Sequence, residues 1–250
     1  MLDQALTDSW GFFKRHLGAL MAIVLPVVIP LQVIMALYGA NSVEQEGSVS
    51  GIFVTSALGL AVYAFYIGAV IFYIASVTSG EKRSTGELYR LGLRFWGPLL
   101  LLVLMVAFAV FAGFMLFIIP GVLLAIKLAF AEFDLLLNGS NPVDACKTSW
   151  QLTRNRKGTL FGGYLIITLV IYVPLFVIEA LLGGFNVTHW TVYATTATVT
   201  TVCNLFYTIF AFRVYDLTLA QQREEVEQQQ EADLNLDADA DSDTKGPGAE

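Results

Sequence analysis

The ionisable residues inside apolar runs are the ones whose side chains could do chemistry here. Residues 118–137, IIPGVLLAIKLAFAEFDLLL, carry Lys127, Glu132 and Asp134 among aliphatic and aromatic neighbours, and Glu179 lies in a later apolar run. A lysine at the centre of a bilayer costs about 2.5–3.5 kcal/mol on insertion scales. A lysine and a glutamate at comparable depth could therefore form an ion pair or serve the passage of an ion or solute.

Three interpretations of the two isolated charges stay open. Lys127 and Glu179 could form a structural ion pair, could act in transport, or could each extend separately to a membrane surface without meeting. Glu132 and Asp134 lie within six residues of Asn138, at the end of a short helix. We expect headgroup water to reach these two carboxylates.

The sequence shows no catalytic or metal-binding arrangement. His16 and His189 are predicted on opposite faces of a membrane, and Cys146 and Cys203 are far apart and in no CxxC pattern. We therefore expect no catalytic residue, no metal ligand and no cofactor, and we predict that the protein is not an enzyme.

The composition favours a membrane protein with several spans. The chain is 56 % hydrophobic and 14 % charged, whereas soluble domains carry about 25 % charged residues. Residues 213–250 hold eleven of the 21 acidic residues and three of the 14 basic ones, so the remainder is nearly balanced. No nucleic-acid partner is expected. The acidic tail 221–250 is predicted to be cytoplasmic and disordered after a short helical extension.

We predict an all-α polytopic fold with six transmembrane helices in three hairpins. A helix needs about 20 apolar residues to cross a bilayer, and the expected spans, of which the fourth is short, are 17–39, 52–78, 97–119, 122–137, 159–183 and 187–212. One helix over 97–137 would be about 60 Å long, twice the hydrocarbon thickness. The dipeptide Pro120-Gly121 is therefore the predicted hairpin turn.

The distribution of basic residues predicts the orientation. Connections rich in Lys and Arg alternate with connections that have none, provided that the chain crosses twice between Gly97 and Asn138. Cytoplasmic loops carry the excess of Lys and Arg. We therefore place both termini in the cytoplasm, with every basic residue except Lys127 on that side.

A weak internal repeat precedes each predicted hairpin. Residues 5–20 align with 145–160 at an offset of 140, and residues 88–99 align with the first copy at an offset of 79. Each copy is basic, aromatic and amphipathic, which suits a headgroup layer. The predicted lipid-contacting residues are Trp10, Lys14, Arg15, Tyr89, Arg90, Arg94, Trp150, Arg154, Arg156 and Lys157. Ordinary anchoring beside a membrane would produce the same pattern.

The segment FIIPGVLLAIKLAFAEFDLLL, followed by NPVDACKTSWQLTRNR, resembles the YciC-type family of bacterial inner-membrane proteins. The matching features are Pro120-Gly121, Lys127 six positions later and the series Ala145, Ser149, Leu152. The likeness covers roughly residues 1–220 and extends to the membrane domain that accompanies some glycerophosphodiester phosphodiesterases. It implies an inner-membrane location without a reaction, since those enzymes carry their chemistry in a separate domain.

Three functions are compatible with these observations. The leading hypothesis is a non-enzymatic inner-membrane protein that binds or organises lipid in envelope homeostasis, with membrane phospholipids as partners. The first alternative is a small-solute or lipid transporter that uses Lys127, Glu179 and the threonine-rich last span. The second is an assembly partner of another membrane complex. The sequence predicts no oligomeric state.

Overall fold

The structure, a computed structural model, describes residues 2–41, 49–183 and 190–244. Side chains are described for residues 2–35, 55–178, 180 and 195–230.

Every element among the described residues is a helix, as predicted. The elements are α1 (Leu2–Asn41), α2 (Val49–Thr78), α3 (Thr85–Leu116), α4 (Ile118–Lys127), α5 (Ala131–Asn138), α6 (Pro142–Leu152), the 3₁₀ turn η1 (Thr153–Asn155), α7 (Lys157–Gly183) and α8 (Trp190–Thr244). The first two predicted interfacial segments continue directly into the helices that follow them. Only the third interfacial segment, which forms α6, is separated by a turn, η1, from the helix that follows it, α7.

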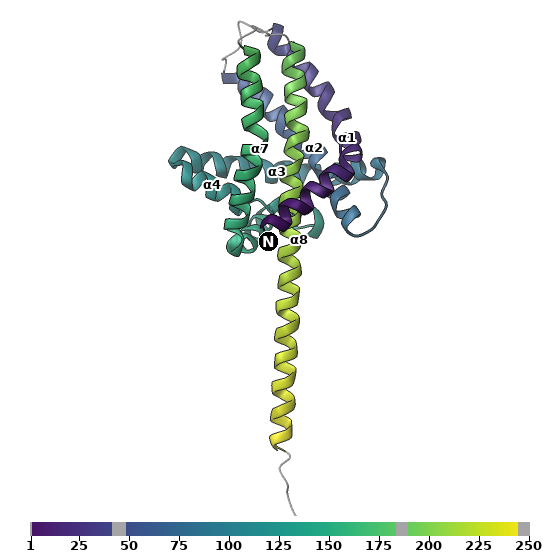
Figure 1. Ribbon diagram of the computed structural model, residues 1–250, viewed down its shortest axis with the longest axis vertical. Helices are drawn as coiled ribbons and strands as arrows, with labels where there is room; N and C mark the ends of the chain where they lie inside the picture. The colour runs from purple at the N-terminus through teal and green to yellow at the C-terminus, as the bar shows by residue number, and fades with distance from the viewer. Residues whose placement is uncertain (1, 42–48, 184–189, 245–250) are drawn as a thin grey trace, which may run out of the picture.

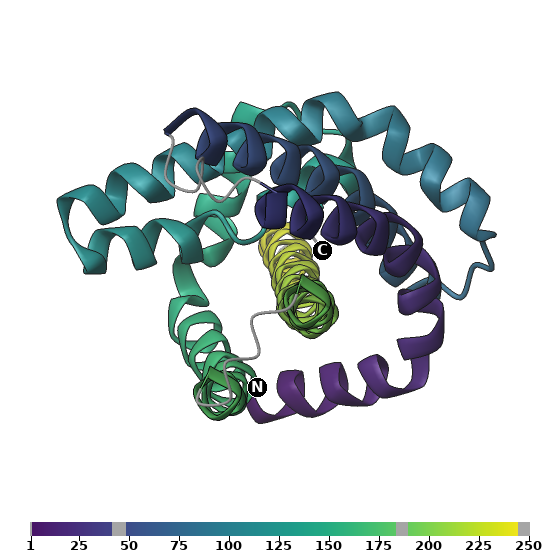
Figure 2. The ribbon, with the colours of Figure 1, turned by 90° about the horizontal axis from the view of Figure 1, so that it is seen from above.

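Two directions dominate the arrangement. Helices α7 and α8 run along the long axis, whereas α3 and α4 project sideways (Figure 1). Seen along α8, the first part of α1 and the α3–α4 pair lie across this axis (Figure 2). Five described helices, α1, α2, α3, α7 and α8, are long and apolar enough to cross a membrane. The chain is thus consistent with a multi-pass membrane protein, but six spans in three hairpins are not confirmed.

The chain reverses between α3 and α4, but not at the predicted residues. The turn is Phe117, whose backbone is extended at φ −163° and ψ 160°. Pro120 and Gly121 instead lie in the first turn of α4. Proline is tolerated there because the first amides of a helix have no partner within the helix. The predicted turn is therefore wrong by about three residues.

The predicted span 122–137 is not one helix, because the chain breaks between α4 and α5. The carbonyl of Lys127 accepts hydrogen bonds from the hydroxyls of Ser149 (2.8 Å) and Thr153 (3.3 Å). The amide of Phe130 donates to Ser149 Oγ at 3.0 Å. These side chains replace the helical hydrogen bonds that the break removes, so buried backbone groups stay paired.

Helix α5 lies in the core of the bundle. Phe130, just before it, and Phe133 are buried, and both rings pack against Tyr215 of α8 with centroids 5.4 and 5.5 Å away. Phe133 also meets the edge of Phe212 at 5.6 Å. Aromatic contacts of this geometry contribute about 0.5–1.5 kcal/mol each beyond the burial of their surface.

The core position of α5 corrects the expectation for its carboxylates. Asp134 is only 2 % exposed and accepts a hydrogen bond from Asn138 Nδ2 at 2.7 Å. Glu132 accepts from the hydroxyl of Tyr63 on α2, at 3.2 Å to each oxygen. Asp134 is therefore not placed in headgroup water, and both carboxylates are held by protein donors.

The acidic tail differs from the disorder predicted for 221–250. Helix α8 continues through Thr244, and every side chain from Gln221 to Gln230 is exposed. Glu, Gln and Ala are good helix formers, so this segment can be helical without packing against a core.

Candidate functional site

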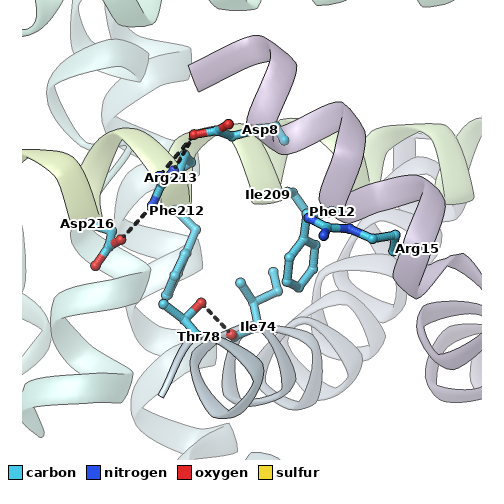
Figure 3. Close-up of a pocket in the computed structure, with 10 residues that line it drawn as sticks. Asp8, Phe12, Arg15, Ile74, Thr78, Ile209, Phe212, Arg213 and Asp216 are labelled. Carbon is cyan, nitrogen blue, oxygen red and sulfur yellow. Dashed lines mark hydrogen bonds and ion pairs between the residues drawn. The ribbon is translucent and has the colours of Figure 1, made fainter. Parts of the chain in front are cut away.

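A cavity of about 280 Å³ lies between α1, α2 and α8. Charged side chains from α1 and α8 line it together with apolar side chains from all three helices (Figure 3). The lining residues are Asp8, Ser9, Phe12, Arg15, Ile74, Thr78, Ile209, Phe212, Arg213 and Asp216.

One side of this cavity is a carboxylate–guanidinium–carboxylate triad. Arg213 donates to Asp8 Oδ2 from Nη2 at 2.9 Å and from Nε at 3.2 Å, and to Asp216 Oδ2 from Nη1 at 3.0 Å. The three side chains are 33–40 % exposed. Within the described residues, neither Oδ1 atom has a hydrogen-bond partner. The triad therefore carries one net negative charge and two carboxylate oxygens, one on each aspartate, that Arg213 does not use.

The other charged group of the cavity is Arg15. Its Nε donates to the carbonyl of Gly11 at 3.1 Å, which fixes the side chain along α1. Figure 3 shows Arg15 on the opposite side from Asp216, with Phe12 and Ile209 between them. The cavity therefore has an acidic end and a basic end.

Sequence reasoning found Arg15 but missed the rest of this cavity. Asp8 and Arg213 are 205 positions apart, and no local pattern joins them. The available signals were weak: an acidic residue just before Trp10, and an i,i+3 Arg213/Asp216 pair at the end of the last apolar run.

Lys127 belongs to a second polar cluster, away from the cavity. Its Nζ donates to the carbonyl of Trp150 at 3.0 Å and lies 4.9 Å from the centre of that ring. The residue is 7 % exposed and lies outside the five candidate spans. Burial lowers the pKa of Lys127, and the charges of Lys157 and Arg154 lower it further. Trp150 is in the last turn of α6, so the ammonium satisfies a carbonyl at a helix C-terminus.

The predicted ion pair between Lys127 and Glu179 stays a prediction. The side chain of Glu179 lies outside the described residues. Lys127 is next to the turn that precedes α7, whereas Glu179 is 22 positions beyond the first residue of that helix, or about 33 Å of helical rise.

The internal repeat is visible as a common pattern of burial. Ala5 and Ala145 are both 0 % exposed, and Ser9 and Ser149 are 1 % and 0 % exposed. Trp10 and Trp150 follow them at 50 % and 49 %. The aligned leucines Leu20, Leu99 and Leu160 are all fully buried. Sequence positions that align thus occupy equivalent environments.

Cations accompany the aromatic rings of these segments. Lys14 Nζ lies 5.3 Å from the centre of the Trp10 ring, and the Arg94 guanidinium lies 6.0 Å from that of Phe95. Of the predicted interfacial cations, Arg156 is half-buried and the exposed ones are Lys14, Arg15, Arg90, Arg94, Arg154 and Lys157.

Tyr89 differs from the two tryptophans with which it aligns. It is half-buried, and its hydroxyl donates to the carbonyl of Ile23 on α1. Pro26, a residue type that can bend a helix, lies three positions after Ile23 in α1. Tyr89 therefore joins α3 to α1 by a hydrogen bond. Trp10 also contacts another helix, since its ring meets the edge of Phe206 on α8 at 5.9 Å, but Trp10 and Trp150 stay half-exposed.

The sequence matches the model of an uncharacterised protein family, UPF0259, over residues 32–217. This range covers about three quarters of the chain. The chain belongs to this family. The UPF0259 range includes Lys127, Trp150, Arg213 and Asp216 but not Asp8 or Arg15. No solved structure is significantly similar to the chain.

Proposed function

We propose that the protein is a non-enzymatic integral membrane protein that binds phospholipid through its repeated basic, aromatic segments. In this proposal it is a YciC-type protein of the bacterial inner membrane, with both termini in the cytoplasm and a role in organising the envelope. Phospholipids are its partners, and no cofactor takes part.

The observation that supports this proposal most is the equivalence of two tryptophans. Trp10 and Trp150 are half-exposed at aligned positions, and each has an ammonium next to its ring, from Lys14 and Lys127 respectively. An indole partly outside the protein is suited to the boundary between acyl chains and headgroups. Two such sites on one chain favour repeated contact with a single membrane surface.

The charges next to the second tryptophan favour anionic headgroups. Arg154 and Lys157 are exposed, and no ion pair links either residue to a described carboxylate. Each basic residue near an anionic leaflet contributes about 1 kcal/mol of attraction. These two residues, together with the half-buried Arg156, would enrich anionic lipid around the start of α7.

The test is the lipid content of the purified protein. Replacing Arg154, Arg156 and Lys157 together with Gln should lower the co-purified anionic lipid severalfold, as measured by mass spectrometry after gentle solubilisation. A matched control removes three cations outside the repeat, Lys82→Gln, Arg83→Gln and Arg223→Gln. Equal lipid content in the wild type and the first variant would refute the proposal, as would equal losses in both variants.

The transport alternative rests on Lys127 and Glu179. The hydrogen bond from Lys127 to the end of α6 gives that lysine a structural role, and the cavity is lined by other residues. These observations favour lipid binding over transport. The assembly-partner alternative predicts a co-purifying protein in the same preparation.

A further inference from the structure

The cavity between α1, α2 and α8 is separate from the predicted interfacial tryptophans and contains an unusual distribution of charge. Its two carboxylates share one guanidinium, and Arg15 provides a second positive group on the opposite side (Figure 3). The four charges sum to zero, but the triad at one end is negative and Arg15 at the other end is positive. Such a cavity suits a ligand that carries both a positive and a negative charge.

The acidic end fits a primary ammonium. Asp8 and Asp216 each use Oδ2 to bind Arg213, and within the described part of the chain their Oδ1 atoms have no partner. An ammonium with three N–H groups can donate to such atoms, in charge-assisted hydrogen bonds that are about twice as strong as neutral ones. A quaternary ammonium has no N–H and cannot form them.

The basic end fits a phosphate. Arg15 uses Nε for the carbonyl of Gly11, which leaves its terminal amino groups for an anion. A guanidinium binds phosphate oxygens with matched geometry. Between the two ends, Phe12, Ile74 and Ile209 provide an apolar wall that a short carbon chain can contact.

We propose that this cavity binds a phosphodiester of ethanolamine, with the ammonium between Asp8 and Asp216 and the phosphate on Arg15. This inference deepens the proposed lipid interaction and rests on it only insofar as the ligand is a lipid headgroup. The same chemistry occurs in phosphatidylethanolamine and in soluble glycerophosphoethanolamine. The experiment separates these two sources.

The experiment uses the full-length protein in detergent. Titration calorimetry with glycerophosphoethanolamine tests the shared headgroup, and native mass spectrometry tests retention from an equimolar mixture of phosphatidylethanolamine, phosphatidylcholine and phosphatidylglycerol. We expect retention of the ethanolamine lipid over the choline lipid. Asp216→Asn and Arg15→Gln should each weaken ethanolamine binding about tenfold, the change produced by losing one strong polar contact.

The variants are chosen so that folding and binding can be separated. The Asp216→Asn variant keeps an amide oxygen that can accept from Arg213, and Arg15 makes no ion pair with a described residue, so both variants should keep the melting temperature of the wild type. If one does not fold, the other still tests the proposal. Arg223→Gln is the matched control, because this exposed arginine lies outside both the cavity and the repeated segments and should leave ethanolamine binding unchanged.

Each outcome has a defined meaning. Binding of the soluble compound without retention of the lipid supports the site and identifies a soluble ligand. Equal retention of ethanolamine and choline lipids, or unchanged binding in both cavity variants, overturns the proposal. Loss of anionic lipid in the Arg154, Arg156 and Lys157 variant is measured separately, so failure of the cavity and failure of the proposed function are distinguishable.

Discussion

The ammonium of Lys127 bonds to the carbonyl of Trp150 at 3.0 Å while lying 4.9 Å from the centre of the same residue's ring. One side chain thus contacts both the backbone end of α6 and its exposed aromatic residue. The backbone carbonyl of Lys127 in turn accepts hydrogen bonds from the hydroxyls of Ser149 and Thr153. The junction of α4 with α6 is therefore held together from both directions.

Removing this ammonium should destabilise the protein. Lys127→Met keeps most of the apolar stem but loses the charged hydrogen bond, which contributes about 1.5–3 kcal/mol. Thermal unfolding in detergent should show a lower melting temperature. The control is Lys14→Met, whose exposed ammonium also lies over a tryptophan and should change stability by well under 1 kcal/mol. An unchanged melting temperature for Lys127→Met would exclude the structural role.

The hydroxyl of Ser149 should be essential to the break between α4 and α5. In Ser149→Ala the buried amide of Phe130 loses its acceptor, at a cost of about 1–3 kcal/mol. Ser9→Ala is the matched control, because Ser9 is equally buried but donates only to Ala5 of its own helix. Hydrogen exchange at Phe130 should rise in the first variant alone. Equal exchange in both variants would contradict this role.

These two interactions show how far sequence reasoning could go. The apolar helices, the reversal after α3 and the repeat follow from local composition and spacing, and the structure contains all of them. The break in the predicted span 122–137 does not follow from local sequence, because it depends on the hydroxyls of Ser149 and Thr153, more than twenty positions away from Lys127. A continuous apolar run is compatible with one helix until such a partner is known.

The cavity could not be predicted from the sequence for a related reason. Asp8 and Arg213 meet because α1 packs against α8, a contact between opposite ends of the chain. By contrast, Trp10 and Trp150 were identifiable, since the repeat carries them in equivalent local settings. The prediction that Lys127 and Glu179 lie at comparable depth assumes a continuous helix over 122–137, whereas α4 ends at Lys127 itself.

Close packing of α3 on α4 should depend on Gly113. A Cβ atom there would lie 2.9 Å from the Cα of Gly121 and 2.8 Å from a methyl of Leu124. The backbone contact cannot be relieved by a rotamer change, so Gly113→Ala should cost about 1–3 kcal/mol. Gly97→Ala, in the same helix but with no atom within 4 Å of the new Cβ, should be neutral or stabilising by up to about 1 kcal/mol. Melting temperatures in one detergent compare the two, and equal values would argue against the close contact.

The start of α6 should be sensitive to acid. The hydrogen bonds to Asp144 from Lys147 (2.9 Å) and then Asn141 (3.2 Å) lower the pKa of its carboxyl below the ordinary value. A carboxyl with a lowered folded pKa stabilises the fold above its unfolded pKa of about 3.9 and loses that contribution as pH falls further. The protection factor of the amides in the first turn of α6, which corrects the exchange rate for the intrinsic rate at each pH, should therefore fall below about pH 4.

Asp144→Asn provides the control for this acid sensitivity. The variant should have the lower protection factor already at pH 6, and this factor should change little between pH 6 and pH 3. If the wild type has the same protection factor at both pH values, the carboxylate does not stabilise this turn.

The tip of the α3–α4 hairpin should be in contact with lipid. Phe117, Ile118 and Ile119 are 73–75 % exposed and entirely apolar, and the hairpin runs across the axis of α8 (Figure 2). If α7 and α8 cross the bilayer, a hairpin at this angle lies along the membrane and its tip does not reach water. In a Cys146→Ala, Cys203→Ala background, Ile118→Cys should resist an impermeant maleimide in intact and in permeabilised cells, and should react after denaturation. Gln151→Cys, exposed beside Trp150, should react only after permeabilisation if the basic segments face the cytoplasm. Labelling of position 118 in intact cells would instead support the upright hairpin that the sequence predicts, with its turn at the outer surface.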